Sequence, residues 1–87
     1  MQLKLTYGHK TSHFEFPDGA QVDVAALLAA MQKAQPAEYA RWCDEQGHLR
    51  QSLSVFVNGE NIRYRNGLQT LLNDGDEVIV IPLVAGG

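Results

Sequence analysis

Apolar and polar residues alternate at the start of the chain. Leu3, Leu5 and Tyr7 are each separated by one polar residue, the period of two that predicts a half-buried strand. The alternation resumes over 13–16 after a turn-like stretch of glycine and polar residues. The two runs therefore predict an N-terminal hairpin, which a Pro-Asp-Gly sequence ends at 17–19.

A helix-forming segment follows the hairpin. Residues 24–33 are mostly alanines and unbranched side chains, which favour helix, and Asp23 can cap the first free amides. The larger apolar side chains share one face of this helix: Val24, Leu27, Leu28 and Met31. Such a stripe predicts an amphipathic helix that lies across a sheet and ends before Pro36. We expect a second short helical turn over 37–43.

Strand character returns in the second half of the chain, at 53–57 and again at 77–81. The first of these runs ends at an Asn-Gly pair, a strong turn signal, and an Asp-Gly-Asp turn precedes the second. Between them, 62–64 predicts a short strand and 68–72 predicts a helical turn.

The order of elements is hairpin, helix, strand, short strand, strand and a tail. If the last strand lies beside the first, the protein is an α+β domain with a mixed sheet of four to five strands. One main helix then covers one face, which is the β-grasp arrangement of ubiquitin. We expect this domain over 1–82 and a flexible tail over 83–87. Its predicted core consists of Leu3, Leu5, Val24, Leu27, Leu28, Met31, Val55, Val57, Val78 and Val80.

Length and composition favour a carrier or adaptor over an enzyme. A chain of 87 residues, 45% hydrophobic and 20% charged, has little room for a deep pocket with converging catalytic groups. The formal charge of −3, with seven scattered Lys and Arg residues, argues against partners such as nucleic acid or an anionic membrane. One cysteine, no long apolar run and no signal-peptide pattern together predict a reduced, cytoplasmic location.

Few residues are candidates for bound metal or for catalysis. Cys43 lacks a CxxC partner and follows Trp42 on a predicted helical turn, so we interpret it as structural. Three histidines without metal-ligand spacing are interpreted as surface residues: His9, His13 and His48. No phosphate loop or catalytic motif is present in the sequence. We therefore expect no metal, no catalytic residue and no bound cofactor.

The two faces of the predicted sheet differ in what covers them. If Val55 and Val57 point to the helix, alternation leaves three apolar side chains on the opposite face, close to Leu83: Phe56, Ile79 and Ile81. An exposed apolar patch of this kind marks a protein interface, so we expect a partner to bind there. The alternative is that the loop 44–52, or the ring of Tyr64, folds over the patch.

The end of the chain is slender and without charged side chains from Pro82 onward. Two terminal glycines lack Cβ atoms, so the segment Leu83, Val84, Ala85 and Gly86 can enter a narrow active site of a partner enzyme. The carboxylate of Gly87 then becomes the reactive group. Attack on the α-phosphate of ATP gives an acyl-adenylate, which sulfur can open to a thiocarboxylate. The alternative is an unstructured end, or a chain cut at a convenient point.

Several segments of the second half resemble the bacterial sulfur carrier family, which includes the small subunit of molybdopterin synthase and the thiamine carriers. The resemblance rests on Val57-Asn58-Gly59-Glu60, Ile62-Arg63-Tyr64, Gly67-Leu68, Thr70, Asp74-Gly75-Asp76-Glu77-Val78 and Pro82-Leu83-Val84-Ala85-Gly86-Gly87. It is strong over 53–87, whereas before residue 53 only the element order agrees. The segment from Arg63 to Thr70 is most similar to carriers of cysteine and thio-acid biosynthesis.

The resemblance implies a role as protein co-substrate and a set of partners. The first is an adenylating enzyme that is related to ubiquitin E1 and uses ATP. The others are a source of sulfur, which is a sulfur donor enzyme or sulfide, and an acceptor biosynthetic enzyme. Some relatives also need a metalloprotease that exposes the Gly-Gly end. Gly87 would be the modified residue and Gly86 its companion. Alternatives are a molybdopterin synthase small subunit, a ubiquitin-like modifier conjugated through Gly87, and a purely structural interaction domain.

Overall fold

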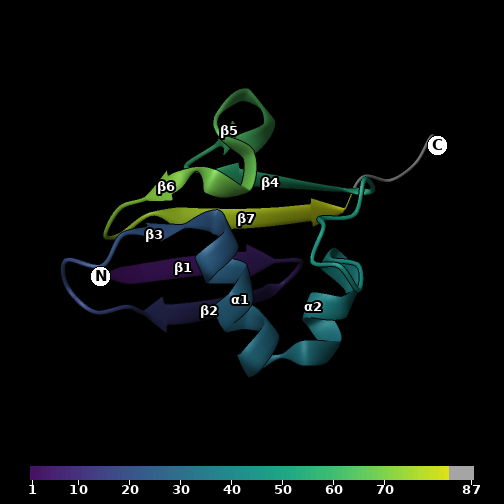
Figure 1. Cartoon of the computed structure of the whole chain (residues 1–87), viewed down its shortest axis with the longest axis horizontal. Helices are drawn as coiled ribbons and strands as arrows, with labels where there is room; N and C mark the ends of the chain where they lie inside the picture. Colours follow the sequence, from purple (N-terminus) through teal and green to yellow (C-terminus); the bar gives the residue numbers. More distant parts are fainter. Residues whose placement is uncertain (83–87) are drawn as a thin grey trace.

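The computed structural model describes residues 1–82, and residues 83–87 lie outside the described part (Figure 1). Strands, α-helices and short 3₁₀ helices (η) follow one another along the chain. In order they are β1 (Gln2–Tyr7), β2 (Lys10–Glu15), β3 (Val22–Asp23), α1 (Val24–Ala34), α2 (Pro36–Trp42), β4 (Leu53–Val57), β5 (Glu60–Asn61), η1 (Ile62–Tyr64), η2 (Gly67–Gln69), β6 (Leu71–Leu72) and β7 (Glu77–Pro82).

Five strands form the main sheet, in the order β2-β1-β7-β4-β5. The first and last long strands, β1 and β7, run parallel with Leu5 opposite Val78, and the other neighbouring pairs are antiparallel. Helix α1 lies across one face of this sheet (Figure 1). The mixed five-stranded sheet confirms the predicted β-grasp fold and the side-by-side placement of the first and last strands.

A second, two-stranded sheet joins β3 to β6, with Val22 opposite Leu72 and Asp23 opposite Leu71. The sequence did not predict it, because two residues are too few to show the alternation of a strand. This small sheet ties the start of α1 to the segment that precedes β7. The Val24 N–H continues the connection by donating a hydrogen bond of 3.1 Å to the Thr70 carbonyl.

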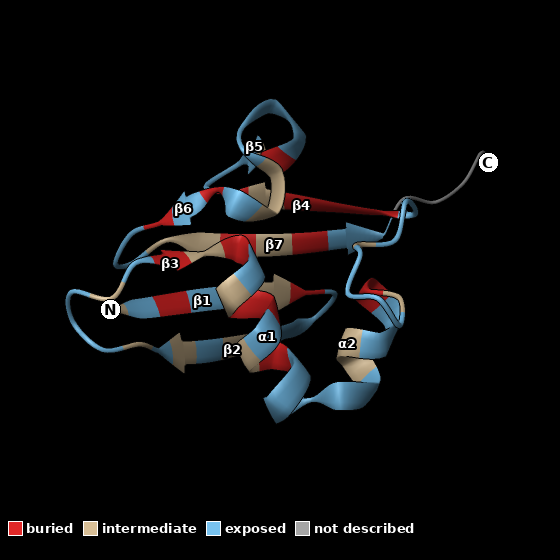
Figure 2. Ribbon diagram, in the orientation of Figure 1, coloured by how far each residue is buried: buried red, intermediate tan, exposed pale blue. Residues whose placement is uncertain are grey.

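The core lies between α1 and the main sheet, where the buried positions of the strands meet the buried stripe of the helix (Figure 2). All ten predicted core residues are buried, and none is more than 4% exposed. The core also takes in residues that the pattern did not assign to it: Tyr7, Val22, Trp42, Cys43, Leu53, Ile62 and Leu72. Alternation in strands and the spacing along α1 therefore predicted the centre of the core correctly.

The ends of α1 follow local chemistry. The Asp23 carboxylate accepts a hydrogen bond of 2.8 Å from the Ala26 N–H, so it caps the helix as predicted. At the other end the Gln35 N–H donates to the Met31 carbonyl at 2.7 Å. Pro36 then begins α2, at a position where an amide proton would have no helical partner. The predicted second helical turn is confirmed as this seven-residue helix.

Two predictions between β4 and β7 need correction. The predicted strand at 62–64 is the 3₁₀ helix η1, because the Asn61 side chain accepts a 2.9 Å hydrogen bond from the Arg63 N–H and turns the chain. The predicted helical turn at 68–72 is only partly right. Helix η2 spans Gly67–Gln69, and Leu71–Leu72 form β6 instead.

Candidate functional site

The face of the main sheet opposite α1 carries the three apolar residues that the sequence singled out. Phe56 on β4 lies directly opposite Ile79 on β7, and Ile81 follows two residues further along the same strand. Phe56 and Ile79 are half-buried, and Ile81 is 44% exposed. We call these three residues the open face.

Alternation creates the open face. The neighbours of these residues on β4 and β7 point into the core and are at most 4% exposed: Val55, Val57, Val78 and Val80. On the next strand, Thr6 lies opposite Ile79 and Lys4 lies opposite Glu77. Lys4 and Glu77 form an exposed ion pair of 3.5 Å. The open face therefore has an apolar centre and a polar edge, as many protein interfaces do.

Neither of the coverings considered from the sequence lies over the open face. The ring of Tyr64 is directed into solvent, since the residue is 83% exposed. The loop 44–52 is held to α2, where the Arg50 N–H donates to the Trp42 carbonyl at 2.8 Å and the Arg50 side chain donates to the Ala40 carbonyl. The open face is thus left accessible by the part of the chain that the structure describes.

The predicted tail residues Leu83, Val84, Ala85, Gly86 and Gly87 lie outside the described residues, so their predicted role stays a prediction. The point from which they leave the domain is well defined. Strand β7 is paired on both sides, with β1 and with β4, and its last residue, Pro82, lies opposite Leu53. The strand that precedes the tail is therefore the middle strand of the sheet, and its last described residue follows Ile81 of the open face.

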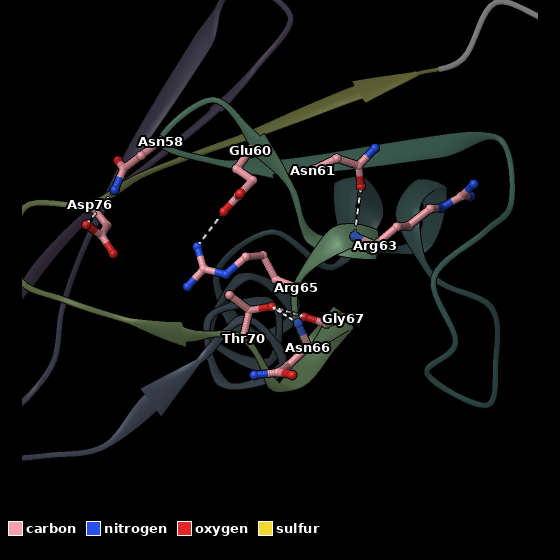
Figure 3. A network of polar contacts seen from close by, with 9 residues as sticks. All are labelled: Asn58, Glu60, Asn61, Arg63, Arg65, Asn66, Gly67, Thr70 and Asp76. Carbon is pink, nitrogen blue, oxygen red and sulfur yellow. Dashed lines mark hydrogen bonds and ion pairs between the residues drawn. The ribbon is translucent and has the colours of Figure 1, made fainter.

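The Asn-Gly and Asp-Gly-Asp turns, which carry part of the family resemblance, contact each other. Asn58 and Gly59 both have positive φ, 50° and 86°, as a tight two-residue hairpin turn requires. The Asn58 side chain donates to the Asp76 carboxylate at 2.8 Å (Figure 3). It also accepts a hydrogen bond of 3.0 Å from the Glu77 N–H. These contacts hold the start of β7 in place. The two turns therefore have a structural role, and no chemical role needs to be assigned to them.

The segment from Arg63 to Thr70 forms the connection through η1 and η2 (Figure 3). Thr70 is 1% exposed, and its hydroxyl donates to the Gly67 carbonyl at 2.7 Å and accepts from the Asn66 N–H at 3.1 Å. Arg65 pairs with Glu60 at 2.6 Å on the surface. Thr70 thus anchors the connection, while Arg63 and Tyr64 remain at the surface.

The single cysteine is part of the core. Cys43 is 2% exposed, and burial raises the pKa of its thiol. A buried, protonated thiol is a poor nucleophile, in agreement with the structural role predicted for it. Within residues 1–82 no group of three or more metal-ligating side chains comes together, and no helix is long and apolar enough to cross a membrane.

The mixed five-stranded sheet with α1 across one face defines a ubiquitin-like β-grasp protein. The chain belongs to the ThiS family, whose family model matches residues 5–87. It is therefore a member of the ubiquitin-like sulfur carrier superfamily, as the resemblance over 53–87 implied.

Several curated relatives are similar in sequence. A protein of Archaeoglobus fulgidus that bears the name "Putative sulfur carrier protein" is 37% identical over 70 residues, which cover 80% of each chain. Small archaeal modifier protein 3 of Haloferax volcanii is 36% identical over 70 residues, 77% of this chain and 76% of the relative. The sulfur carrier protein CysO of Mycobacterium tuberculosis is 44% identical over 41 residues, 47% of this chain and 44% of the relative.

Solved structures confirm the fold. The crystal structure of small archaeal modifier protein 1 from Haloferax volcanii superposes with a TM-score of 0.83 over all of both chains, at 23% identity. The solution structure of the corresponding protein from Methanosarcina acetivorans gives a TM-score of 0.77 at 27% identity, covering 99% of this chain and 96% of that one.

Proposed function

We propose that this protein is a sulfur carrier that serves enzymes as a co-substrate, with the carboxylate of Gly87 as its working group. The observation that carries the proposal is the match to the ThiS family, which extends through residue 87 and includes the uncharged Gly-Gly end. Relatives of similar length that bear the name sulfur carrier protein support it. A small domain with a buried cysteine and an accessible sheet face suits a carrier better than a catalyst.

The proposed chemistry takes place on the tail, inside partner enzymes. A carboxylate oxygen of Gly87 attacks the α-phosphorus of ATP held by an E1-like enzyme, and pyrophosphate leaves. Sulfide then attacks the carbonyl carbon of the adenylate, and AMP leaves. Where a donor enzyme supplies the sulfur as a persulfide, the persulfide attacks in the same way, and a second thiol of the donor reduces the resulting acyl disulfide, which releases the thiocarboxylate and leaves a disulfide on the donor. The resulting thiocarboxylate delivers its sulfur to an electrophile on the acceptor enzyme, and hydrolysis of the acyl group returns the carboxylate.

The open face is the surface that we propose for docking to the activating enzyme. It lies on the strand that leads into the tail, so an enzyme that holds it also controls where the tail enters. Ile79→Asp places a carboxylate at the centre of the patch, where an apolar partner surface would have to desolvate it. We expect adenylation, measured as pyrophosphate release with the purified activating enzyme, to fall at least about tenfold.

A matched control separates docking from a general effect of the substitution. Leu71 is 50% exposed and belongs to β6, outside the main sheet. Leu71→Asp makes the same chemical change away from the open face, so adenylation should stay within about twofold of wild type. Circular dichroism checks that both variants are folded. Equal adenylation rates for the two variants would rule out the open face as the docking surface.

The product is proposed to be cysteine or another sulfur-containing metabolite. Two observations support this choice over molybdopterin: the Arg63 to Thr70 segment and the 44% identity to CysO over 41 residues. The test supplies the thiocarboxylate form to a pyridoxal-phosphate cysteine synthase and, separately, to a molybdopterin synthase large subunit. Consumption of the thiocarboxylate only by the large subunit would overturn the proposed product.

One other function is favoured by a specific observation. The 36% identity to small archaeal modifier protein 3 supports a modifier, joined through Gly87 to lysine amines of other proteins. The same activated carboxylate serves both reactions, and only the acceptor differs. Isopeptide-linked peptides ending in Gly87, found in cells that hold no thiocarboxylate form, would favour the modifier. Thiocarboxylate without conjugates would favour the carrier.

A further inference from the structure

A cavity of about 460 Å³ opens at the end of the sheet from which the tail leaves. The turn after β1, helix α2 and the last residue of β7 surround it, and Pro82 forms part of its wall. We call this cavity the tail groove. Its volume lies in the range of sites that hold a ligand or a few side chains of a partner.

The floor of the tail groove is apolar and preformed. Tyr7 and Trp42, 6% and 3% exposed, contact each other edge to face with ring centres 5.0 Å apart. The Tyr7 hydroxyl is held by the Gln35 side chain at 3.0 Å and lies 3.2 Å from the Ser12 hydroxyl. Because both rings are fixed by the core, binding in the groove requires little rearrangement of the floor.

The rim of the tail groove is positively charged, although the chain as a whole carries a formal charge of −3. Lys10 and Arg41 line it, with Glu38 as the carboxylate among its lining residues. Within residues 1–82, ion pairs engage Lys4 and Arg65 but neither of these two cations. The groove therefore offers an apolar floor and two unpaired cations to whatever binds there.

The position of the groove relates it to the tail. Along β7, Val80 and Pro82 line the tail groove, whereas Ile79 and Ile81 belong to the open face. The described part of β7 therefore ends at Pro82 with one of these surfaces on each side of the strand. A partner that holds the tail can therefore contact the domain on both sides of the strand that leads into it.

We propose that the tail groove binds a segment of the activating enzyme in which an apolar side chain stands next to one or two carboxylates. This proposal rests on the proposed function, because it assumes that an enzyme activates Gly87. The apolar side chain would cover the Tyr7 and Trp42 rings, and the carboxylates would pair with Lys10 and Arg41. Such charge complementarity selects the partner and orients the tail before the chemical step.

The test compares two double variants that carry the same change in charge. Lys10→Glu with Arg41→Glu alters the groove, and Lys33→Glu with Arg63→Glu alters two other exposed cations without ion pairs among residues 1–82. Each substitution removes two units of charge, so both proteins go from −3 to −7. Binding to the purified activating enzyme is measured by calorimetry at low and at high salt, after circular dichroism has shown that both variants are folded.

We expect the groove variant to bind roughly tenfold more weakly than wild type at low salt, and the control variant to stay within about threefold. The difference between the two variants should shrink in 0.5 M salt, because the Debye length is then on the order of 4 Å and the charges are screened. Replacing the complementary carboxylate of the enzyme by lysine should restore binding of the groove variant. In spectra of the ¹⁵N-labelled chain, the Trp42 indole signal should shift when wild type binds the enzyme.

Each contrary result has a distinct meaning. If both variants bind the enzyme equally weakly, or if the Trp42 signal does not shift, the groove proposal is overturned. The proposed function still stands in that case, provided that the enzyme adenylates the wild type. A Trp42 shift caused by glutamate or phosphate alone would make the groove a small-anion site. A shift caused by deleting residues 83–87 in the absence of enzyme would make the chain's own tail the occupant. No binding and no adenylation of the wild type would contradict both proposals.

Discussion

Truncation of Leu27 tests whether α1 is placed correctly on the sheet. The side chain is fully buried, with an exposed fraction of 0%. Leu27→Ala removes three carbon atoms, worth roughly 2.4 kcal/mol at about 0.8 kcal/mol each, and leaves a cavity that adds to this cost. We therefore expect the free energy of unfolding to fall by about 3 kcal/mol, within a range of about 2 to 5 kcal/mol.

A loss of this size is large for a small domain. At about 0.05 to 0.15 kcal/mol per residue, the total stability of this chain is on the order of 4 to 13 kcal/mol. The melting temperature of the variant should be lower by roughly 12 to 24 °C. Urea unfolding can be followed by the fluorescence of Trp42, which is 3% exposed and contacts Tyr7.

The matched control is Leu71→Ala, the same truncation at a leucine that is 50% exposed. Half of this side chain is already in water, so its loss should cost less than about 1 kcal/mol. A cost below about 0.5 kcal/mol for Leu27→Ala, or equal costs for both leucines, would refute the placement of α1 with Leu27 against the sheet.

Three further predictions concern stability and reactivity. Thr70→Val leaves the Asn66 N–H without its acceptor and should cost about 1 to 3 kcal/mol in urea unfolding, whereas Thr11→Val, at an exposed position, should cost less than about 0.5 kcal/mol. Cys43 should react with iodoacetamide at pH 8 at least about tenfold more slowly in the folded than in the urea-unfolded chain, and equal rates would contradict its burial. The hydrogen bond from the His48 N–H lowers the pKa of Asp44 in the folded chain. The ionised Asp44 carboxylate therefore stabilises the fold above its unfolded-state pKa of about 3.9, and this stabilisation is lost as the pH falls through the lower folded-state pKa. Asp44→Asn should therefore weaken the pH dependence of the urea midpoint below about pH 4, and an unchanged dependence would refute this cause.

The sequence predicted those parts of the fold that repeat a period over several residues. Alternation in β1, β4 and β7 identified the buried valines and, on the other side, Phe56, Ile79 and Ile81. The spacing along α1 identified its buried stripe. The Asn-Gly pair predicted a hairpin turn, which the positive φ angles of Asn58 and Gly59 confirm.

Features that depend on tertiary contacts could not be predicted in this way. The β3–β6 pair joins two-residue segments 50 positions apart, Val22 and Leu72, which carry no periodic signal. The turn at 62–64 is set by a side-chain cap at Asn61 rather than by the apolar residue within it. Lys10 and Arg41 are ordinary surface residues in the sequence, and only the packing of α2 beside the β1–β2 turn brings them to one groove.

The central claim is that the carboxylate of Gly87 becomes a thiocarboxylate, and intact-mass analysis tests it most directly. The chain is incubated with the activating enzyme, ATP and a sulfur donor, and a form without Gly87 serves as the control. Adding one residue beyond Gly87 moves the carboxylate by about 3.5 Å, so an extended chain should also fail to react while remaining folded. Replacement of one oxygen by sulfur predicts a mass increase of about 16 Da, located in the C-terminal peptide of the wild type and absent from both controls. An unchanged wild-type mass with an enzyme that demonstrably adenylates Gly87 would contradict the assignment as a sulfur carrier.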